Sequence, residues 1–80
     1  MKHLIVVCEY GWILCGVFNA AETSDTTLEL SEASVVRRWS NGRGIGGLAK
    51  AEYKDDYTLG PIGDVSVSQG KVLFTIPCEW

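Results

Sequence analysis

The residues best suited to bind a ligand are basic residues and glycines gathered in one stretch, Ala33–Lys50. This stretch holds four of the seven Lys and Arg residues and four of the nine glycines, and it contains no acidic residue. These positive charges stand in a chain whose net charge is −3. Focused positive charge beside conformationally free backbone is typical of a site for a small anion.

The glycine-rich segment Gly42–Gly47 is the first candidate element of that site. Glycine allows backbone N–H groups to turn toward an anion, and a helix that begins at Ile45 would add the N–H groups of its first turn. Arg43 would add a bidentate contact to a phosphate group. The segment lacks the G-K-S/T of a P-loop, and no G-x-G-x-x-G motif aligns with it. A flexible surface turn is the competing interpretation.

The preceding segment Val35–Trp39 is the second candidate. Alternation along a strand places Arg37 and Trp39 on one face and Arg38 on the other. Trp39 would then stack on a base while Arg37 contacts a phosphate. Alternatively, Trp39 lies in the core and both arginines extend to solvent. The predicted ligand-binding residues are Arg37, Trp39, Ser40, Asn41, Gly42, Arg43, Gly44 and Gly46.

Catalysis has little support in the residue types. His3 is the single histidine, Ser40 has no neighbouring base, and Asp55–Asp56 lacks the His or Cys ligands of a transition-metal site. We therefore expect no enzyme, no catalytic residue, no metal and no cofactor.

Size and cysteine usage bound the class of protein. The 80 residues suit one small domain, residues 1–80, with a core near the lower limit for independent folding. Three cysteines without C-x-x-C spacing favour free thiols in the cytoplasm over a disulfide framework or a zinc site. The apolar run Leu4–Cys8 is too short for a signal peptide or a membrane span. We expect no membrane contact, and a homo-oligomer, a dimer with the pocket near its interface, as the source of extra buried area.

A long nucleic acid is not an expected partner. The pI is near 4.9 and acidic residues occur in all segments outside Ala33–Lys50, so the protein would repel a polyanion. The basic stretch is also too short to contact several successive phosphates.

Hydrophobic patterning predicts a mainly-β or α+β domain in which a curled, partly closed sheet carries one short helix after the glycine-rich loop. A rigid loop at Leu59–Gly63 cannot be a central strand. The first two strands and the last two, joined at Tyr10-Gly11 and Gln69-Gly70, are expected to form hairpins, and Gly16 to mark a bulge or a close backbone approach. The helix is expected over Ile45–Tyr53, and about six short strands over His3–Glu9, Trp12–Phe18, Thr26–Leu30, Val35–Trp39, Asp64–Ser68 and Lys71–Ile76.

The run L-E-L-S-E-A-S-V-V-R-R-W-S over Leu28–Ser40, with a later G-L-A and I-P-C, resembles a family of small phage proteins of this length. The distinctive part is A-x-x-V-R-R-W. Small phage proteins without catalytic residues are frequently counter-defence factors, and one class sequesters cyclic nucleotide alarm signals. By analogy with that class, the resemblance leads us to expect a non-enzymatic sponge for a cyclic nucleotide in the host cytoplasm.

A second hypothesis is a protein-interaction module that inhibits a host enzyme through exposed aromatic residues such as Trp12 and Trp80. A third, an enzyme, would need a general base or a metal set that the sequence does not show.

Overall fold

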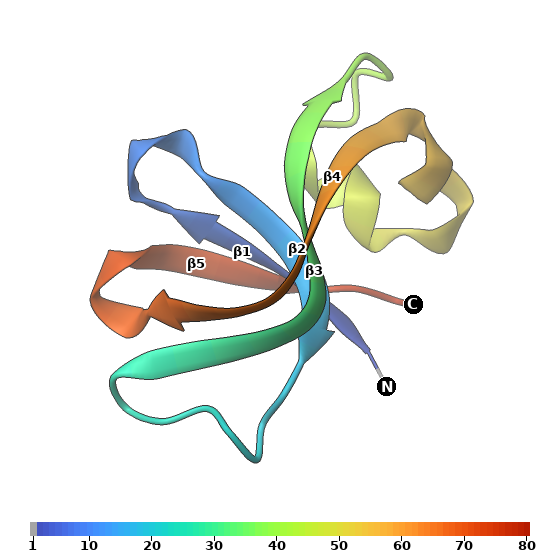
Figure 1. Cartoon of the computed structure of the whole chain (residues 1–80). Coiled ribbons are helices and arrows are strands. Elements are labelled where there is room, and N and C mark those ends of the chain that lie inside the picture. The colour runs from blue at the N-terminus through green and yellow to red at the C-terminus, as the bar shows by residue number, and fades with distance from the viewer. Residues whose placement is uncertain (1) are drawn as a thin grey trace.

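The computed structural model describes residues 2–80, which form one antiparallel sheet (Figure 1). The mainly-β prediction is confirmed, with five strands in place of six and with the sheet left open. Its order is β4-β3-β2-β1-β5. The strands are β1 (His3–Cys8), β2 (Ile13–Phe18), β3 (Thr27–Trp39), β4 (Tyr57–Ser68) and β5 (Val72–Pro77).

The last two strands lie at opposite edges of the sheet, although they are consecutive in the chain. Only the 3-10 helix η4 (Gln69–Lys71) joins them, so the sheet must curl to bring its two edges within reach. The predicted final hairpin is therefore wrong. β5 pairs instead with β1, and this register places Ile76 opposite Ile5. Long-range packing of apolar residues outweighs the local turn signal.

The long strand β3 combines two predicted strands, Thr26–Leu30 and Val35–Trp39. The break between the two predicted strands is replaced by register shifts on either side of Ala33. Glu32 there has a φ of 50°, and its N–H donates to Asp64 Oδ1 at 3.1 Å. β3 thus bends without ending.

β4 likewise runs through Leu59–Gly63, which the sequence analysis predicts as a loop. Pro61 is compatible with the strand because β4 is an edge, where a missing N–H costs no ladder bond.

Buried side chains form two clusters on opposite faces of the sheet, and β1 contributes to both, as expected for a strand buried on both faces. Ile5 and Val6 are each 0% exposed yet belong to different clusters. The helix-side cluster comprises Ile5, Cys15, Val36, Leu48, Ala49, Tyr57 and Cys78. The pocket-side cluster comprises Val6, Cys8, Leu14, Leu28, Leu30 and Ala33.

Two further expectations are met near these clusters. β1 and β2 pair as the predicted first hairpin, with η1 (Glu9–Gly11) as their turn. A Cβ at Gly16 would lie 2.9 Å from the Cα of Ala33, and the β2–β3 register shifts at this glycine, so both predicted roles of Gly16 are confirmed.

The helix predicted over Ile45–Tyr53 is present as two consecutive 3-10 helices, η2 (Ile45–Ala49) and η3 (Ala51–Asp56). They cover the helix-side cluster. No helix among the described residues is both long enough and apolar enough to cross a membrane.

The C-terminal segment lies beside the start of β1 (Figure 1). His3 N–H donates to Trp80 O at 2.9 Å, and Cys78 N–H donates to His3 O at 3.0 Å. The C-terminal segment therefore extends the β1–β5 ladder and closes one side of the helix-side cluster.

Candidate functional site

The glycine-rich segment is folded around a buried tyrosine of its own chain. Tyr57, 7% exposed, donates its hydroxyl hydrogen to the carbonyl oxygen of Gly44. A Cβ at Gly47 would lie 2.7 Å from the Cβ of Arg43 and closer still to the Tyr57 hydroxyl. Gly47 is thus required by close packing. The charge of the segment Lys54–Thr58 predicts an exposed segment, and this prediction is wrong at Tyr57.

Neighbouring side chains also engage the polar groups of the loop. Arg43 N–H donates to Asn41 Oδ1 at 3.0 Å, and Asn41 Nδ2 donates to Asp56 Oδ2 at 3.3 Å. The Arg43 guanidinium carbon lies 3.8 Å from the centre of the Tyr53 ring, a cation–π contact. Asn41 and Arg43 therefore already have partners within the protein. The other predicted loop residues are exposed: Ser40, Gly42, Gly44 and Gly46.

The predicted pairing of Arg37 with Trp39 on one face is wrong. The β3–β4 register shifts between Val36 and Arg38, which leaves Arg37 as an extra residue in a β-bulge. The bulge changes the alternation, so Val36 and Trp39 both pack in or against the helix-side cluster. The centres of the Trp39 and Tyr57 rings lie 5.5 Å apart. Trp39 is thus a core-facing residue.

Both arginines of the bulge are exposed to solvent, as the alternative interpretation anticipates. The Nε of Arg37 lies 2.6 Å from where a Cβ on Gly60 would be, so this side chain crosses β4 over a glycine. The ion pairs found within residues 2–80 are Lys50–Glu79 and Lys71–Glu9, and they include neither Arg37 nor Arg38.

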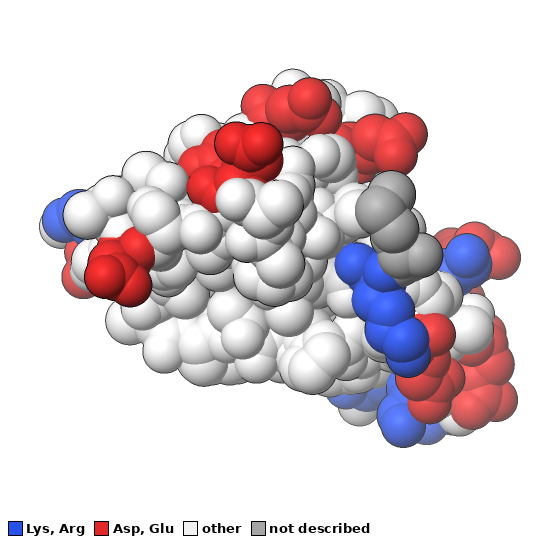
Figure 2. All heavy atoms as spheres, turned by 90° about the horizontal axis from the view of Figure 1, so that it is seen from below, with Lys and Arg blue, Asp and Glu red and all other residues white. Residues whose placement is uncertain are grey.

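The basic groups do not merge into one broad positive surface. On the face shown in Figure 2, Lys and Arg side chains lie at the two ends, beside Asp and Glu side chains. Further Asp and Glu side chains lie along the upper edge, and the area below them is uncharged.

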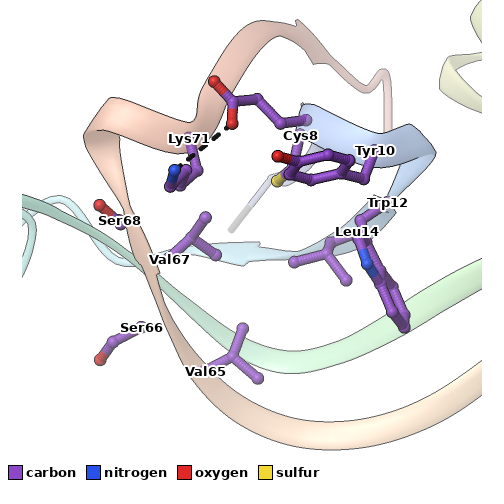
Figure 3. A pocket seen from close by; sticks show the side chains of 10 residues that line it. Cys8, Tyr10, Trp12, Leu14, Val65, Ser66, Val67, Ser68 and Lys71 are labelled. Atoms are coloured by element: carbon purple, nitrogen blue, oxygen red, sulfur yellow. Dashed lines mark ion pairs between the residues drawn. The ribbon is translucent and has the colours of Figure 1, made fainter.

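A cavity of about 430 Å³ lies at the other side of the molecule from the 3-10 helices η2 and η3 (Figures 1 and 3). It opens where the curled sheet does not close, between the β1–β2 turn and the end of β4. Cys8 and Leu14 of the pocket-side cluster form its interior, and Val65 and Val67 of β4 form the opposite wall.

Two aromatic residues stand at the mouth of this pocket. Tyr10 is 93% exposed and Trp12 is 59% exposed, and both line the cavity. An ion pair also lines the pocket: Lys71 Nζ lies 3.5 Å from Glu9 Oε2, and Lys71 lies on the opposite side of the pocket from Trp12 (Figure 3). The site therefore combines an apolar interior, an aromatic rim and one exposed ion pair.

The backbone at Tyr10 adopts a conformation that a bulky side chain rarely takes. Its φ is 63° and its ψ is 21°, and Gly11 follows with a φ of 79°. Two successive positive φ values define the tight hairpin turn that favours Asn-Gly, and a left-handed non-glycine residue costs about 1–2 kcal/mol. Tyr10 is thus strained while almost none of its surface is buried.

Trp12 and Trp80, both predicted to be exposed aromatic residues, have different surroundings in the structure. Trp12 lines the pocket. Trp80 is half-buried, its Nε1 donates to Leu48 O at 2.8 Å, and its ring lies 4.3 Å from that of His3. Trp80 therefore has a structural role. The pocket is not foreseen from sequence, because it depends on how the sheet curls.

The thiols are poorly suited to nucleophilic chemistry at neutral pH. Burial, with a smaller contribution from neighbouring Cys78, raises the pKa of Cys15 to about 12. Burial also raises the pKa of Cys8, whose side chain reaches the pocket. Both stay protonated, so the pocket presents a thiol and not a thiolate. Within residues 2–80, no group of three His, Cys, Asp or Glu side chains is placed to hold a metal ion.

Comparisons with protein-family models, with curated proteins and with solved structures gave no significant match.

Proposed function

We propose that this protein is a non-enzymatic interaction module whose pocket takes an apolar side chain of a partner protein. The observation that carries the proposal is Tyr10. A residue that is strained and 93% exposed contributes little to stability, and such residues concentrate at functional sites. Its place at the mouth of an apolar cavity makes binding the function that best accounts for it.

The chemistry of the pocket supports an apolar guest flanked by polar groups. Valine, leucine and thiol side chains line the interior, so a buried charged guest would lose its hydration without compensation. Aromatic residues at the rim supply large contact areas with little entropy loss, as at protein–protein hot spots. The Glu9–Lys71 pair would remain exposed beside the guest and contribute orientation more than affinity.

The test uses two small probes, N-acetyl-leucinamide and N-acetyl-tryptophanamide, titrated into ¹⁵N-labelled protein. We expect chemical-shift changes in Cys8–Leu14 and Val65–Lys71, and weakening by about tenfold in Trp12→Ser, equivalent to about 1.4 kcal/mol. Phe18→Ser is the matched control, because Phe18 is 39% exposed and lies outside the pocket. Shift changes confined to other residues, or equal weakening in both variants, would contradict the proposal.

A second candidate function is the sequestration of a small phosphorylated ligand, a cyclic nucleotide immune signal, at the bulge. It is favoured by the exposure of Arg37 and Arg38 and by the absence of an ion pair to either in residues 2–80. Gly60 gives Arg37 room to lie across β4. The resemblance to small phage proteins points the same way, by analogy with phage counter-defence factors.

Its test is a thermal-shift screen of cyclic di- and trinucleotides and ADP-ribose derivatives. A ligand at 100 times its Kd should add about 2.7 kcal/mol to the free energy of unfolding. Because the bulge brings both arginines to solvent, Arg37→Ala and Arg38→Ala should each weaken binding, whereas Lys54→Ala, remote in the sequence from the bulge, should not. Recovery of the intact ligand after heat denaturation separates sequestration from catalysis.

A further inference from the structure

The dipeptide Asn41-Gly42 is a chemically reactive pair in an exposed loop. In such a pair the backbone nitrogen of the glycine can attack the side-chain carbonyl carbon of the asparagine, because no Cβ on the glycine obstructs the approach. Gly42 is exposed, has a φ of 74°, and would meet no atom within 4 Å if it carried a Cβ. It also lies outside the strands and the 3-10 helices, so no regular structure holds its backbone away from the geometry of attack.

The hydrogen bonds around this dipeptide favour the reaction. None of the hydrogen bonds found in residues 2–80 uses the N–H of Gly42, so no such bond must break before this nitrogen loses its proton. Arg43 N–H donates to Asn41 Oδ1 at 3.0 Å. This bond polarises the carbonyl group and stabilises the negative charge that develops on its oxygen during attack. The fold therefore supplies an oxyanion donor that an unfolded chain does not hold in place.

The side-chain nitrogen of Asn41, which would leave in this reaction, lies in a wet environment. Asn41 Nδ2 donates to Asp56 Oδ2 at 3.3 Å, Asp56 is exposed and Asn41 is half-buried. Water can therefore carry a proton to the departing nitrogen and can react with the product that remains.

We propose that Asn41-Gly42 is a site of self-modification, at which the chain converts Asn41 into isoaspartate and aspartate without an enzyme. A bond forms between Gly42 N and Asn41 Cγ, the bond between Cγ and Nδ2 breaks, and ammonia leaves with the proton that Gly42 N releases. Water then opens the resulting cyclic imide at one or the other carbonyl carbon, which gives aspartate or isoaspartate. The reaction needs no oxidant or reductant, and it is independent of both proposed functions because it needs no partner and no ligand.

The products change the loop in which they form. A carboxylate in place of the Asn41 amide cannot donate to Asp56, and it puts two like charges side by side. Isoaspartate also adds a methylene group to the backbone before Gly42, which displaces the acceptor of the Arg43 N–H bond. The modification therefore loosens the loop and reduces the positive charge of the basic stretch.

The test is incubation of the folded, unmodified protein at mildly alkaline pH, followed by peptide mapping with mass spectrometry. Asn19 is the matched control within the same chain. It is half-buried too, and its Oδ1 accepts a hydrogen bond from Glu22 N–H at 3.3 Å, but Ala20 follows it. We expect Asn41 to convert at least about tenfold faster than Asn19, a difference of about 1.4 kcal/mol in the barrier. Equal rates at the two asparagines would overturn the proposal.

A second measurement separates the contribution of the fold from that of the dipeptide. The same incubation in urea removes the bond between Arg43 and Asn41, so conversion in the folded protein should be no more than about tenfold slower than in urea. A larger protection by folding would contradict the proposal.

A pair of variants tests the attacking residue. Gly42→Ala should slow conversion at Asn41 by at least about tenfold, whereas Gly46→Ala, where a Cβ also meets no atom within 4 Å, should leave the rate unchanged. Circular dichroism establishes that both variants are folded. An unchanged rate in Gly42→Ala would exclude attack by the backbone nitrogen.

Discussion

The glycine-rich segment and the pocket lie at two sides of one small sheet. They differ in how far their residues are engaged by contacts within the protein. Around Gly47 the chain is closed: the Tyr57 hydroxyl donates to Gly44 O, and the Tyr53 ring and Asn41 engage Arg43. At Tyr10 the chain is open, with a strained backbone and an aromatic ring left in solvent. Glycine and arginine residues that cluster in the sequence can therefore have a packing role. A strained residue that is not buried, such as Tyr10, gains no such packing, so its conformation needs a different explanation.

The same contrast separates the two kinds of evidence for function. Gly47 is explained completely by the atoms that surround it, so it requires no ligand. Tyr10 is explained by no contact within the protein that would offset its backbone cost. Substitutions in the two regions should therefore change stability in opposite directions.

The largest effect is expected at the closed region. Gly47→Ala would force a methyl group against Tyr57 and Arg43, and should lower the free energy of unfolding by about 3 kcal/mol, the upper part of the range for overpacked sites. Gly46→Ala is the matched control, because a Cβ there meets no atom within 4 Å. It should be neutral or gain about 0.5–1 kcal/mol through a less flexible unfolded chain. Urea unfolding measures both, and equal losses would mean that Gly47 is not tightly enclosed.

The next effect is a decrease in the free energy of unfolding at alkaline pH. The folded protein holds the Cys15 proton up to a pKa of about 12, above the ordinary value of 9.0 that applies when unfolded. The unfolded state therefore releases its proton first. The stabilisation is fully present below pH 9.0 and is lost as the pH rises toward 12, by at most about 1.4 kcal/mol per pH unit.

Cys15→Ala should remove most of this slope between pH 9 and pH 10.5, a window of about one and a half units above the unfolded pKa. Cys8→Ala, at the open pocket, should leave most of it in place. Chemical unfolding at several pH values gives both slopes. If Cys8→Ala removed more of the pH dependence of stability than Cys15→Ala, the thiol at the pocket would be the more strongly buried one, contrary to the comparison.

The smallest effect is a gain in stability at the pocket. Tyr10→Asn should raise the free energy of unfolding by about 0.5–1 kcal/mol, because Asn-Gly suits two successive positive φ values and little packing is lost. Tyr10→Phe keeps the backbone preference and should stay within about 0.5 kcal/mol of the unmodified protein. A loss of stability in Tyr10→Asn, seen by calorimetry, would show that Tyr10 stabilises the fold and would remove the main support for the pocket as a binding site.

The sequence predicts the local features of this fold better than its long-range features. The β class, the first hairpin and the close approach at Gly16 follow from β-branched runs, a Tyr-Gly turn and a glycine inside a strand. The partners of β4 and β5 do not, because strand pairing depends on residues far apart in the chain.

The candidate site depends on a β-bulge and on the curl of the sheet, which are harder to predict from the sequence than strand pairing. One inserted residue at Arg37 reverses the alternation that placed Arg37 with Trp39, and nothing in the local sequence marks the bulge. The pocket arises from the curl of the whole sheet. Trp12 could be named as an exposed aromatic, but its neighbours from β4 come from more than fifty residues away along the chain.

The meeting of His3 with Trp80 has a practical consequence for how the molecule can be handled. Because His3 and Trp80 lie side by side and neither lines the pocket, a tether attached beside either residue would leave the cavity open to solution. A short linker could also join the neighbourhoods of His3 and Trp80, with the chain opened in the exposed segment Ala20–Glu22, without separating any pair of neighbouring strands. Such a permuted chain would begin with β3 and end with β2, and it would present the same surface to a partner.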